Sequence, residues 1–382
     1  MTEQSDTLSR YLGFLRQDPD NIGLLLQVVA QYRAARQPQE AEALLDAALS
    51  KWPGHPTLLH ERALLAMASG DAATAKALFH HLQESGADSP VLRYNTAYAH
   101  YLLGEFADSA AELQQIAPSA YAEVPRAPCL HVLALHHQGE LAAARELAEG
   151  LLATLPEDAD LAGALALTCL DDSDIERASH WAQRSLAIAP AQIYALTTLG
   201  TLELATQPAI AGQHFDRVLA HNPHDGRAWS GLALSYLARE QLDQAAAAFS
   251  QAVKFMPGHI GTWHAYGWLH LLQQRIDDAA RCFQAAFELD HNFGESHGAL
   301  AIIATLRGNT AEADALIKRA QRLAPDGMSV RFVALLQAQA GNDPTRAAAI
   351  VQDAFGALGN GQPQLQALMQ GALARFAAKR DQ

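Results

Sequence analysis

Histidine and cysteine are the side chains of this 382-residue chain that could ligate a metal ion, and there are 17 histidines and three cysteines. The densest group is Cys129, His131, His136 and His137. Cys129 and His136 are seven residues apart, so they would share one face of a helix. Two ligands two turns apart on a straight helix cannot close a tetrahedral site by themselves. The adjacent His80 and His81 would point in different directions on a helix. We therefore expect no metal site and no cofactor.

Patterns that carry catalysis or nucleotide binding are missing from the sequence. There is no Gly-x-Gly-x-x-Gly after a strand, no phosphate-binding Gly-x4-Gly-Lys-Ser/Thr and no Gly-x-Ser-x-Gly turn. His60-Glu61 is not followed by the second histidine of a zinc-protease motif. Cys129, Cys169 and Cys282 are far apart and odd in number, which favours reduced thiols over a disulfide framework. The sequence thus predicts no catalytic residue and no enzyme.

Aromatic side chains are candidates for binding another protein. Tyr94, Tyr98 and Tyr101 form one group, and Trp263 and Trp268 form another. Tyrosine and tryptophan bury a large area with few rotatable bonds, so they often anchor a bound protein. Whether these side chains face a partner or a core depends on the elements that carry them.

The elements follow from a 34-residue period. Trp229 and Trp263 are 34 residues apart, and so are Phe249 and Phe283. Each unit splits into two segments with apolar residues at the spacing of an amphipathic helix. In the clearest unit these residues are Trp229, Leu232, Ala233 and Tyr236, followed by Ala245, Phe249 and Ala252. Pro257 then stops the second helix, because proline cannot donate a hydrogen bond to the preceding turn.

This order of residues resembles the tetratricopeptide repeat family. The same frame covers residues 22–361 in about ten units, ending with a degenerate unit from about Met328 that keeps Ala347, Val351 and Ala354. The resemblance implies an all-α fold, an α-solenoid of helix-turn-helix repeats forming a right-handed superhelix. Amphipathic segments at 1–21 and 362–382 read as capping helices, which an open solenoid needs over its terminal repeats.

One irregularity lies between Ile116 and Pro128, where three prolines interrupt the frame. The next helix should begin late, near Pro128, since proline is tolerated in a first helical turn. Either the connection is simply long, or the stack bends or divides there into N-terminal repeats (22–123) and C-terminal repeats (124–361).

The first helices of successive repeats line the concave groove in this family. Carried onto this chain, the resemblance points to the following groove residues as candidates for partner binding: Tyr94, Asn95, Tyr98, Tyr101, His136, His264 and Trp268. Trp263 occupies the family's packing position, whereas Trp268 does not, so we expect Trp268 to be exposed in the groove. The lysines and asparagines of a chaperone-binding clamp are missing at these positions, and Asn95 stands alone where an asparagine ladder would need a series.

Composition narrows the class of partner. A formal net charge of −14 disfavours nucleic acid and anionic membranes, which need a basic face. The acidity serves solubility or attracts a basic partner. No apolar run reaches the roughly 18 to 20 residues of a membrane span, and the N-terminus lacks the features of a signal peptide. We expect a soluble cytoplasmic protein of undetermined oligomeric state.

These observations predict a protein-protein interaction scaffold or adaptor that binds a peptide or helix of a partner in the concave groove. Assembly of a secretion, pilus or exopolysaccharide machine is one family-level setting. The alternative is a regulatory subunit that controls a separate enzyme. A co-chaperone or an enzyme fits the sequence less well.

Overall fold

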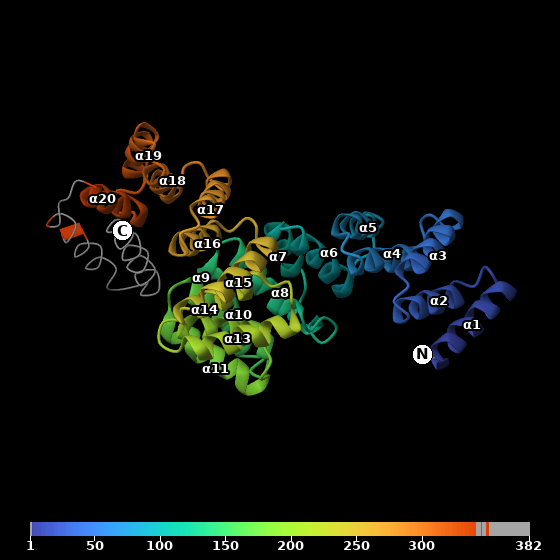
Figure 1. The fold of residues 1–382 in the computed structure, drawn as a ribbon. Coiled ribbons are helices and arrows are strands. Elements are labelled where there is room, and N and C mark those ends of the chain that lie inside the picture. Colours follow the sequence, from blue (N-terminus) through green and yellow to red (C-terminus); the bar gives the residue numbers. More distant parts are fainter. Residues whose placement is uncertain (1, 341–344, 346–348, 351–382) are drawn as a thin grey trace. The chain divides into compact units, whose positions relative to one another are not determined.

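The computed structural model describes residues 2–340, 345, 349 and 350 of the chain. The described residues form helices and connecting turns, without a strand (Figure 1). They confirm the predicted all-α repeat fold. The chain divides into two compact units, Met1–Asp174 and Ile175–Gln382, which are described separately.

Unit 1 begins with α1 (Thr2–Gln17), the single helix expected before residue 22. Four helical hairpins and one further helix follow: α2 (Ile22–Ala34), α3 (Pro38–Lys51), α4 (Pro56–Ala68), α5 (Ala72–Glu84), α6 (Pro90–Leu102), α7 (Phe106–Gln114), α8 (Ala127–His137), α9 (Leu141–Leu152) and α10 (Ala159–Asp171). Consecutive helices pack against each other, and α8 also contacts both α6 and α10. The first helices of adjacent repeats therefore lie next to one another, as in a stack of hairpins.

Unit 2 continues the pattern with one helix, four hairpins and a last helix: α11 (Ile175–Ile188), α12 (Ile193–Glu203), α13 (Pro208–His221), α14 (Gly226–Ala238), α15 (Leu242–Phe255), α16 (Ile260–Leu272), α17 (Ile276–Leu289), α18 (Gly294–Leu306), α19 (Thr310–Leu323) and α20 (Met328–Ala340). Helix α12 contacts α14, and α18 contacts α20. The boundary between the units falls between α10 and α11, the two helices of one predicted repeat.

The second helix of each hairpin shows why the repeat residues are spaced as they are. Phe79, Phe215, Phe249 and Phe283 have almost no exposed surface, and each follows a fully buried alanine by four residues. The small alanine lets the two helices approach, and the phenylalanine one turn later fills the space beside it.

First helices share a way of ending. In most repeats, the second residue after the helix has a left-handed backbone, with φ between 57° and 83° at Arg36, Gly70, Gly104, Gly139, Ser173, Glu240, Gln274 and Gly308. The following amide then reaches back five residues, as from Arg275 to the carbonyl of His270 at 2.8 Å. This closes the helix with a Schellman-type turn and directs the chain into the second helix.

The proline-rich connection confirms the late helix start. A short 3-10 turn, η1 (Pro118–Ala120), precedes α8, which begins at Ala127 with Pro128 in its first turn. The division of the repeats at 123/124 stays a prediction. The predicted residues Ala347, Val351 and Ala354 and the closing helix at 362–382 lie outside the described residues.

Candidate functional site

The tyrosines of α6 form a row of half-buried side chains. The rings of Tyr94 and Tyr98 lie nearly parallel, 6.3 Å apart with an angle of 5° between their planes. Tyr101 meets the ring of Phe106 edge-on at 5.4 Å. All three pack against a buried cluster that includes Leu113 and Leu130, and burial raises the pKa of the Tyr94 and Tyr101 phenols. The tyrosine row (Tyr94, Tyr98 and Tyr101) thus keeps partial exposure while its ring orientation is held by a core.

Asn95 is also on α6, but the structure places it away from solvent. It is 8% exposed, and its amide nitrogen lies 3.2 Å from Nε2 of His60 on α4. Arg33 on α2 pairs with Glu61 at 3.3 Å. Asn95 therefore links two repeats and presents little surface to the groove, so its role in partner binding stays a prediction.

His136 is held in a similar way. It is 7% exposed, its Nδ1 lies 3.2 Å from the Thr168 hydroxyl, and its Nε2 lies 3.2 Å from a carboxylate oxygen of Asp171. Cys129, two turns before His136 on the same helix, is also buried. Burial raises the pKa of its thiol well above the ordinary range. A neutral thiol of this kind is a packing group, so α8 contributes little open surface at these positions.

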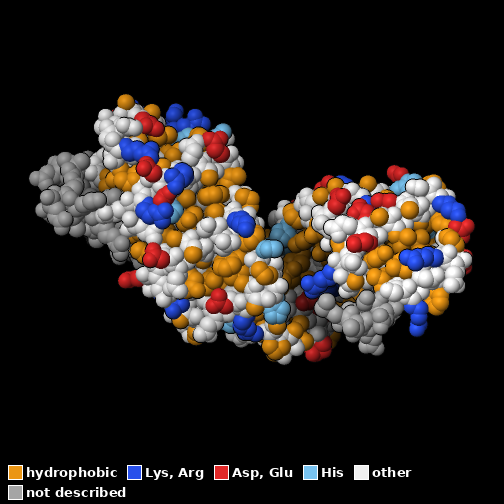
Figure 2. All heavy atoms as spheres, turned by 45° about the vertical axis from the view of Figure 1, so that its right-hand side comes forward, with side chains coloured by type: hydrophobic (Ala, Val, Ile, Leu, Met, Phe, Trp, Pro, Cys, Tyr) orange, Lys and Arg blue, Asp and Glu red, His pale blue; other side chains and the backbone are white. Residues whose placement is uncertain are grey.

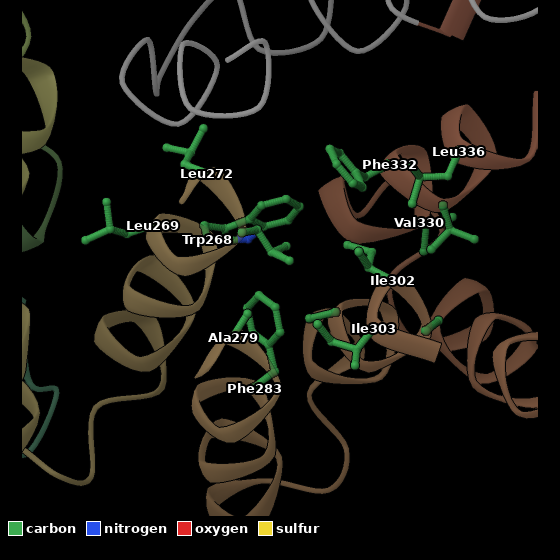
Figure 3. Close-up of a cluster of buried hydrophobic side chains, with 14 of the residues drawn as sticks. Trp268, Leu269, Leu272, Ala279, Phe283, Ile302, Ile303, Val330, Phe332 and Leu336 are labelled. Atoms are coloured by element: carbon green, nitrogen blue, oxygen red, sulfur yellow. The ribbon is translucent and has the colours of Figure 1, made fainter. Parts of the chain in front are cut away.

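Trp268 requires a correction, because the expected exposure of this side chain is wrong. It is 3% exposed and meets the rings of Phe283 and Phe332 edge-on, at 6.1 and 5.1 Å. Figure 3 shows the indole between α16, α17 and α20, inside the largest buried cluster of unit 2. Phe332 comes from α20, so a helix two repeats later contributes to the burial of Trp268. By contrast Trp263 is half-buried, and its indole N–H donates to the carbonyl of Pro257 at 2.8 Å.

His264 is likewise buried, at 8% exposure, and its Nε2 lies 2.9 Å from the hydroxyl of Ser296. Burial lowers its pKa to about 4. The imidazole is therefore neutral near pH 7, and it serves as a hydrogen-bond partner between α16 and α18 and not as a cation for a ligand.

A regular set of contacts between first helices emerges from these positions. Three pairs join side chains that are 32 residues apart: His136 to Thr168, Ser230 to Thr262 at 3.4 Å, and His264 to Ser296. We call them the inter-repeat pairs. The sequence analysis named His136 and His264 but not the hydroxyl residue that each of them contacts. The signal was present, because each histidine or serine has a small hydroxyl residue slightly less than one period later.

A cleft on unit 2 was also missed. It has a volume of about 540 Å³ and lies between α17, α18 and α19. Apolar side chains including Phe287, Leu300 and Leu316 line it, and the ion pair between Arg307 and Asp277 stands at its edge. Its lining comes mainly from second helices, whereas the candidate residues were sought on first helices.

Charge on the surface is mixed. On the face drawn in Figure 2, basic and acidic side chains are interspersed with broad hydrophobic areas. Many of the cations are engaged, for example Arg62 with Glu42 and Asp46. This face gathers no continuous basic stripe of the kind that tracks a phosphate backbone.

Comparison with known families agrees with the repeat architecture. Two family models described as tetratricopeptide repeat match the chain, one at residues 205–260 and 265–327 and the other at residues 32–93. The matched segments coincide with hairpins of both units. These segments of the chain are therefore tetratricopeptide repeats, and proteins built from such repeats bind protein or peptide partners.

Similar proteins differ widely in their described roles. Over 110 residues, 28% of this chain, the sequence is 28% identical to the general transcriptional corepressor trfA of Dictyostelium discoideum, and the match spans only 8% of that protein. Among solved structures, an IFIT1 monomeric mutant with Gppp-AAAA is 14% identical, with a TM-score of 0.49 and coverage of 79% of this chain and 78% of that one. The type IV pilus biogenesis factor PilW is 16% identical, with a TM-score of 0.47 and coverage of 55% and 98%.

No helix among residues 2–340 combines the length and the hydropathy that crossing a bilayer requires.

Proposed function

We propose that the chain is a non-catalytic scaffold that binds an extended peptide of a partner protein along the first helices of unit 1, with the tyrosine row as its anchor. The partial exposure of the tyrosine row carries this proposal. Of the seven candidate groove residues, Asn95, His136, His264 and Trp268 are buried, whereas Tyr94, Tyr98 and Tyr101 keep accessible surface. Parallel, pre-oriented rings lose little conformational entropy when a ligand covers them.

The engagement of Asn95 and Arg33 supports this reading over a co-chaperone. A clamp for a terminal carboxylate needs free donors, and both groups already have partners in the chain. The partner is proposed to be a protein and not a nucleic acid, since the formal net charge is −14.

The test is a selection from a phage-displayed library of 16-residue peptides on the purified full-length chain, followed by fluorescence anisotropy of the selected peptides. Truncating an aromatic anchor typically costs about 2 kcal/mol or more, a loss of roughly 30-fold in affinity. Tyr98→Ala should therefore weaken binding at least about 30-fold. Tyr11→Ala on α1 is the matched control, because Tyr11 is also half-buried but lies outside the tyrosine row.

Unchanged affinity in Tyr98→Ala, with its helical circular dichroism intact, would move the binding surface elsewhere. Loss of affinity in both variants would indicate a general effect of losing a tyrosine. The setting in which such a scaffold works is a separate question. Assembly of a secretion, pilus or exopolysaccharide machine and control of a separate enzyme remain the two alternatives, and identification of the cellular partner by cross-linking through the tyrosine row distinguishes them.

A further inference from the structure

Four side chains with metal-binding chemistry lie at the α5–α6–α7 corner of unit 1, where His100 contacts both His80 and Glu105. His80 comes from α5, His100 from α6, and Glu105 and Asp108 from the start of α7. His80 is half-buried and His100 is buried, while Asp108 is exposed. The sequence analysis compared His80 with its neighbour His81 and found no shared direction. The fold instead pairs His80 with a histidine 20 residues later.

The two imidazoles face each other through the same kind of atom. Nε2 of His80 and Nε2 of His100 are 3.0 Å apart, with their rings at 74°. Two histidine nitrogens that bind one tetrahedral zinc ion at about 2.0–2.1 Å stand about 3.3–3.4 Å apart. Metal binding would open this separation by a few tenths of an ångström and turn both rings so that their Nε2 lone pairs converge on one ion.

The ring of His100 is oriented by a carboxylate. Its Nδ1 lies 2.6 Å from Oε2 of Glu105, and the other oxygen of Glu105 lies 2.6 Å from Nζ of Lys76. The short contact with Glu105 favours a proton on Nδ1 of His100, which leaves the lone pair of Nε2 directed toward His80. A carboxylate behind a metal-binding histidine is the usual outer partner of a zinc ligand.

An oxygen ligand is also within reach. A ring nitrogen of His100 and carboxylate oxygens of Glu105 and Asp108 lie within 4.8 Å of one another. Asp108 is one turn after Glu105 on α7 and is exposed. Imidazole and carboxylate donors together suit zinc and its neighbours and are a poor match for calcium or magnesium.

We propose that this corner of unit 1 binds a divalent transition-metal ion of the zinc class. His80 and His100 ligate it through Nε2, Glu105 orients His100, and Asp108 or solvent completes the coordination. Lys76 keeps its ion pair with Glu105, because Glu105 does not itself ligate the metal. In the metal-free chain the same two histidines share a hydrogen bond, which explains how buried His100 is satisfied in both states.

The experiment titrates Zn²⁺ into the full-length, tag-free, chelator-treated chain against a chromophoric zinc indicator. One equivalent is expected to bind. Glu105→Gln should weaken binding by about 10- to 100-fold, the usual effect of losing an outer-shell carboxylate. His80→Ala removes a ligand outright and should weaken binding more than Glu105→Gln does. Zn²⁺ should also raise the melting temperature of the wild type and leave that of His80→Ala unchanged.

His81→Ala is the matched control, since His81 is the exposed neighbour of His80 on the same helix. It should bind zinc like the wild type. Equal affinity of the wild type and His80→Ala would overturn the proposal and leave the pair as a hydrogen bond only, as would a stoichiometry well below one. Because His100 is buried, the conclusion rests on the His80, Glu105 and His81 variants, each checked by circular dichroism for an intact helical fold.

Discussion

Replacing Gly267 by alanine tests the packing between the two helices of one repeat. Gly267 lies on α16, where a Cβ atom would stand 2.4 Å from Cε1 and 2.7 Å from Cδ1 of Phe283 on α17. Carbon atoms in good contact are about 3.5–4.0 Å apart, so the ring or the helix must move by about 1 Å. Phe283 has no exposed surface and is bordered by Trp268 and His264, which leaves the ring no open side.

The size of the effect follows from two opposing terms. Overpacking a rigid core contact typically costs about 1–3 kcal/mol, whereas glycine to alanine inside a helix gains at most about 1 kcal/mol. We expect Gly267→Ala to lower the free energy of unfolding by about 1–2 kcal/mol. For a unit of about 200 residues this corresponds to a decrease of about 2–8 °C in melting temperature.

Gly13→Ala provides the matched control, because Gly13 is inside α1 and a Cβ there meets nothing within 4 Å. It should be neutral or slightly stabilising. Thermal and urea unfolding followed by circular dichroism measure both variants. Adding Phe283→Leu should make Gly267→Ala less costly in a double-mutant cycle, since the smaller side chain relieves the clash. If Gly267→Ala is as stable as the wild type, or if the cycle shows no coupling, the close contact described for this repeat is incorrect.

Three further predictions concern unit 2. Trp268→Ala should destabilise the chain by about 3–5 kcal/mol in urea unfolding, because it empties a buried site; a change below about 0.5 kcal/mol would return the indole to the surface. His264 has a folded-state pKa of about 4 against about 6.5 when unfolded, so its contribution is present above pH 6.5 and is lost as the pH falls toward 4. The loss is on the order of 3 kcal/mol, and His264→Gln should remove that part of the pH dependence in unfolding measured from pH 7 to 4. Gln274→Gly should stabilise by about 1 kcal/mol, because its backbone is left-handed (φ 60°), while Gly308→Ala at the equivalent turn should destabilise by a similar amount in thermal melts.

The fold could be predicted from the sequence because the residue spacing within each repeat defines the buried face of its helices. The fixed spacing of Ala245 and Phe249, and of Ala279 and Phe283, defines which helix face is buried, and all four are fully buried. The late start of α8 followed from Pro128, since proline restricts where a helix can begin. Such features depend on contacts within one 34-residue repeat, so they can be recognised in the amino-acid sequence.

The candidate site was less predictable, because burial there depends on contacts between periods. Trp268 was assigned to the surface since it departs from the repeat pattern, but α20, two repeats later in the stack, covers it with Phe332. His80 and His100 were not paired in the sequence, because their approach depends on the angle between α5 and α6. The tyrosine row keeps partial exposure for the same kind of reason, and helical spacing alone could not distinguish Tyr98 from Asn95.

The inter-repeat pairs bear on how such an array can change during evolution. Tandem copies of one consensus repeat can be duplicated or exchanged freely, since every junction is the same. Here the junction from α16 to α18 needs a histidine followed by Ser296, whereas the junction from α14 to α16 needs Ser230 followed by Thr262. A repeat moved to a place where the next first helix lacks that hydroxyl would leave a buried histidine without its partner, with the cost of an unsatisfied polar group. The side chains at each junction therefore restrict which repeats can follow one another, even where the hairpins have the same backbone fold.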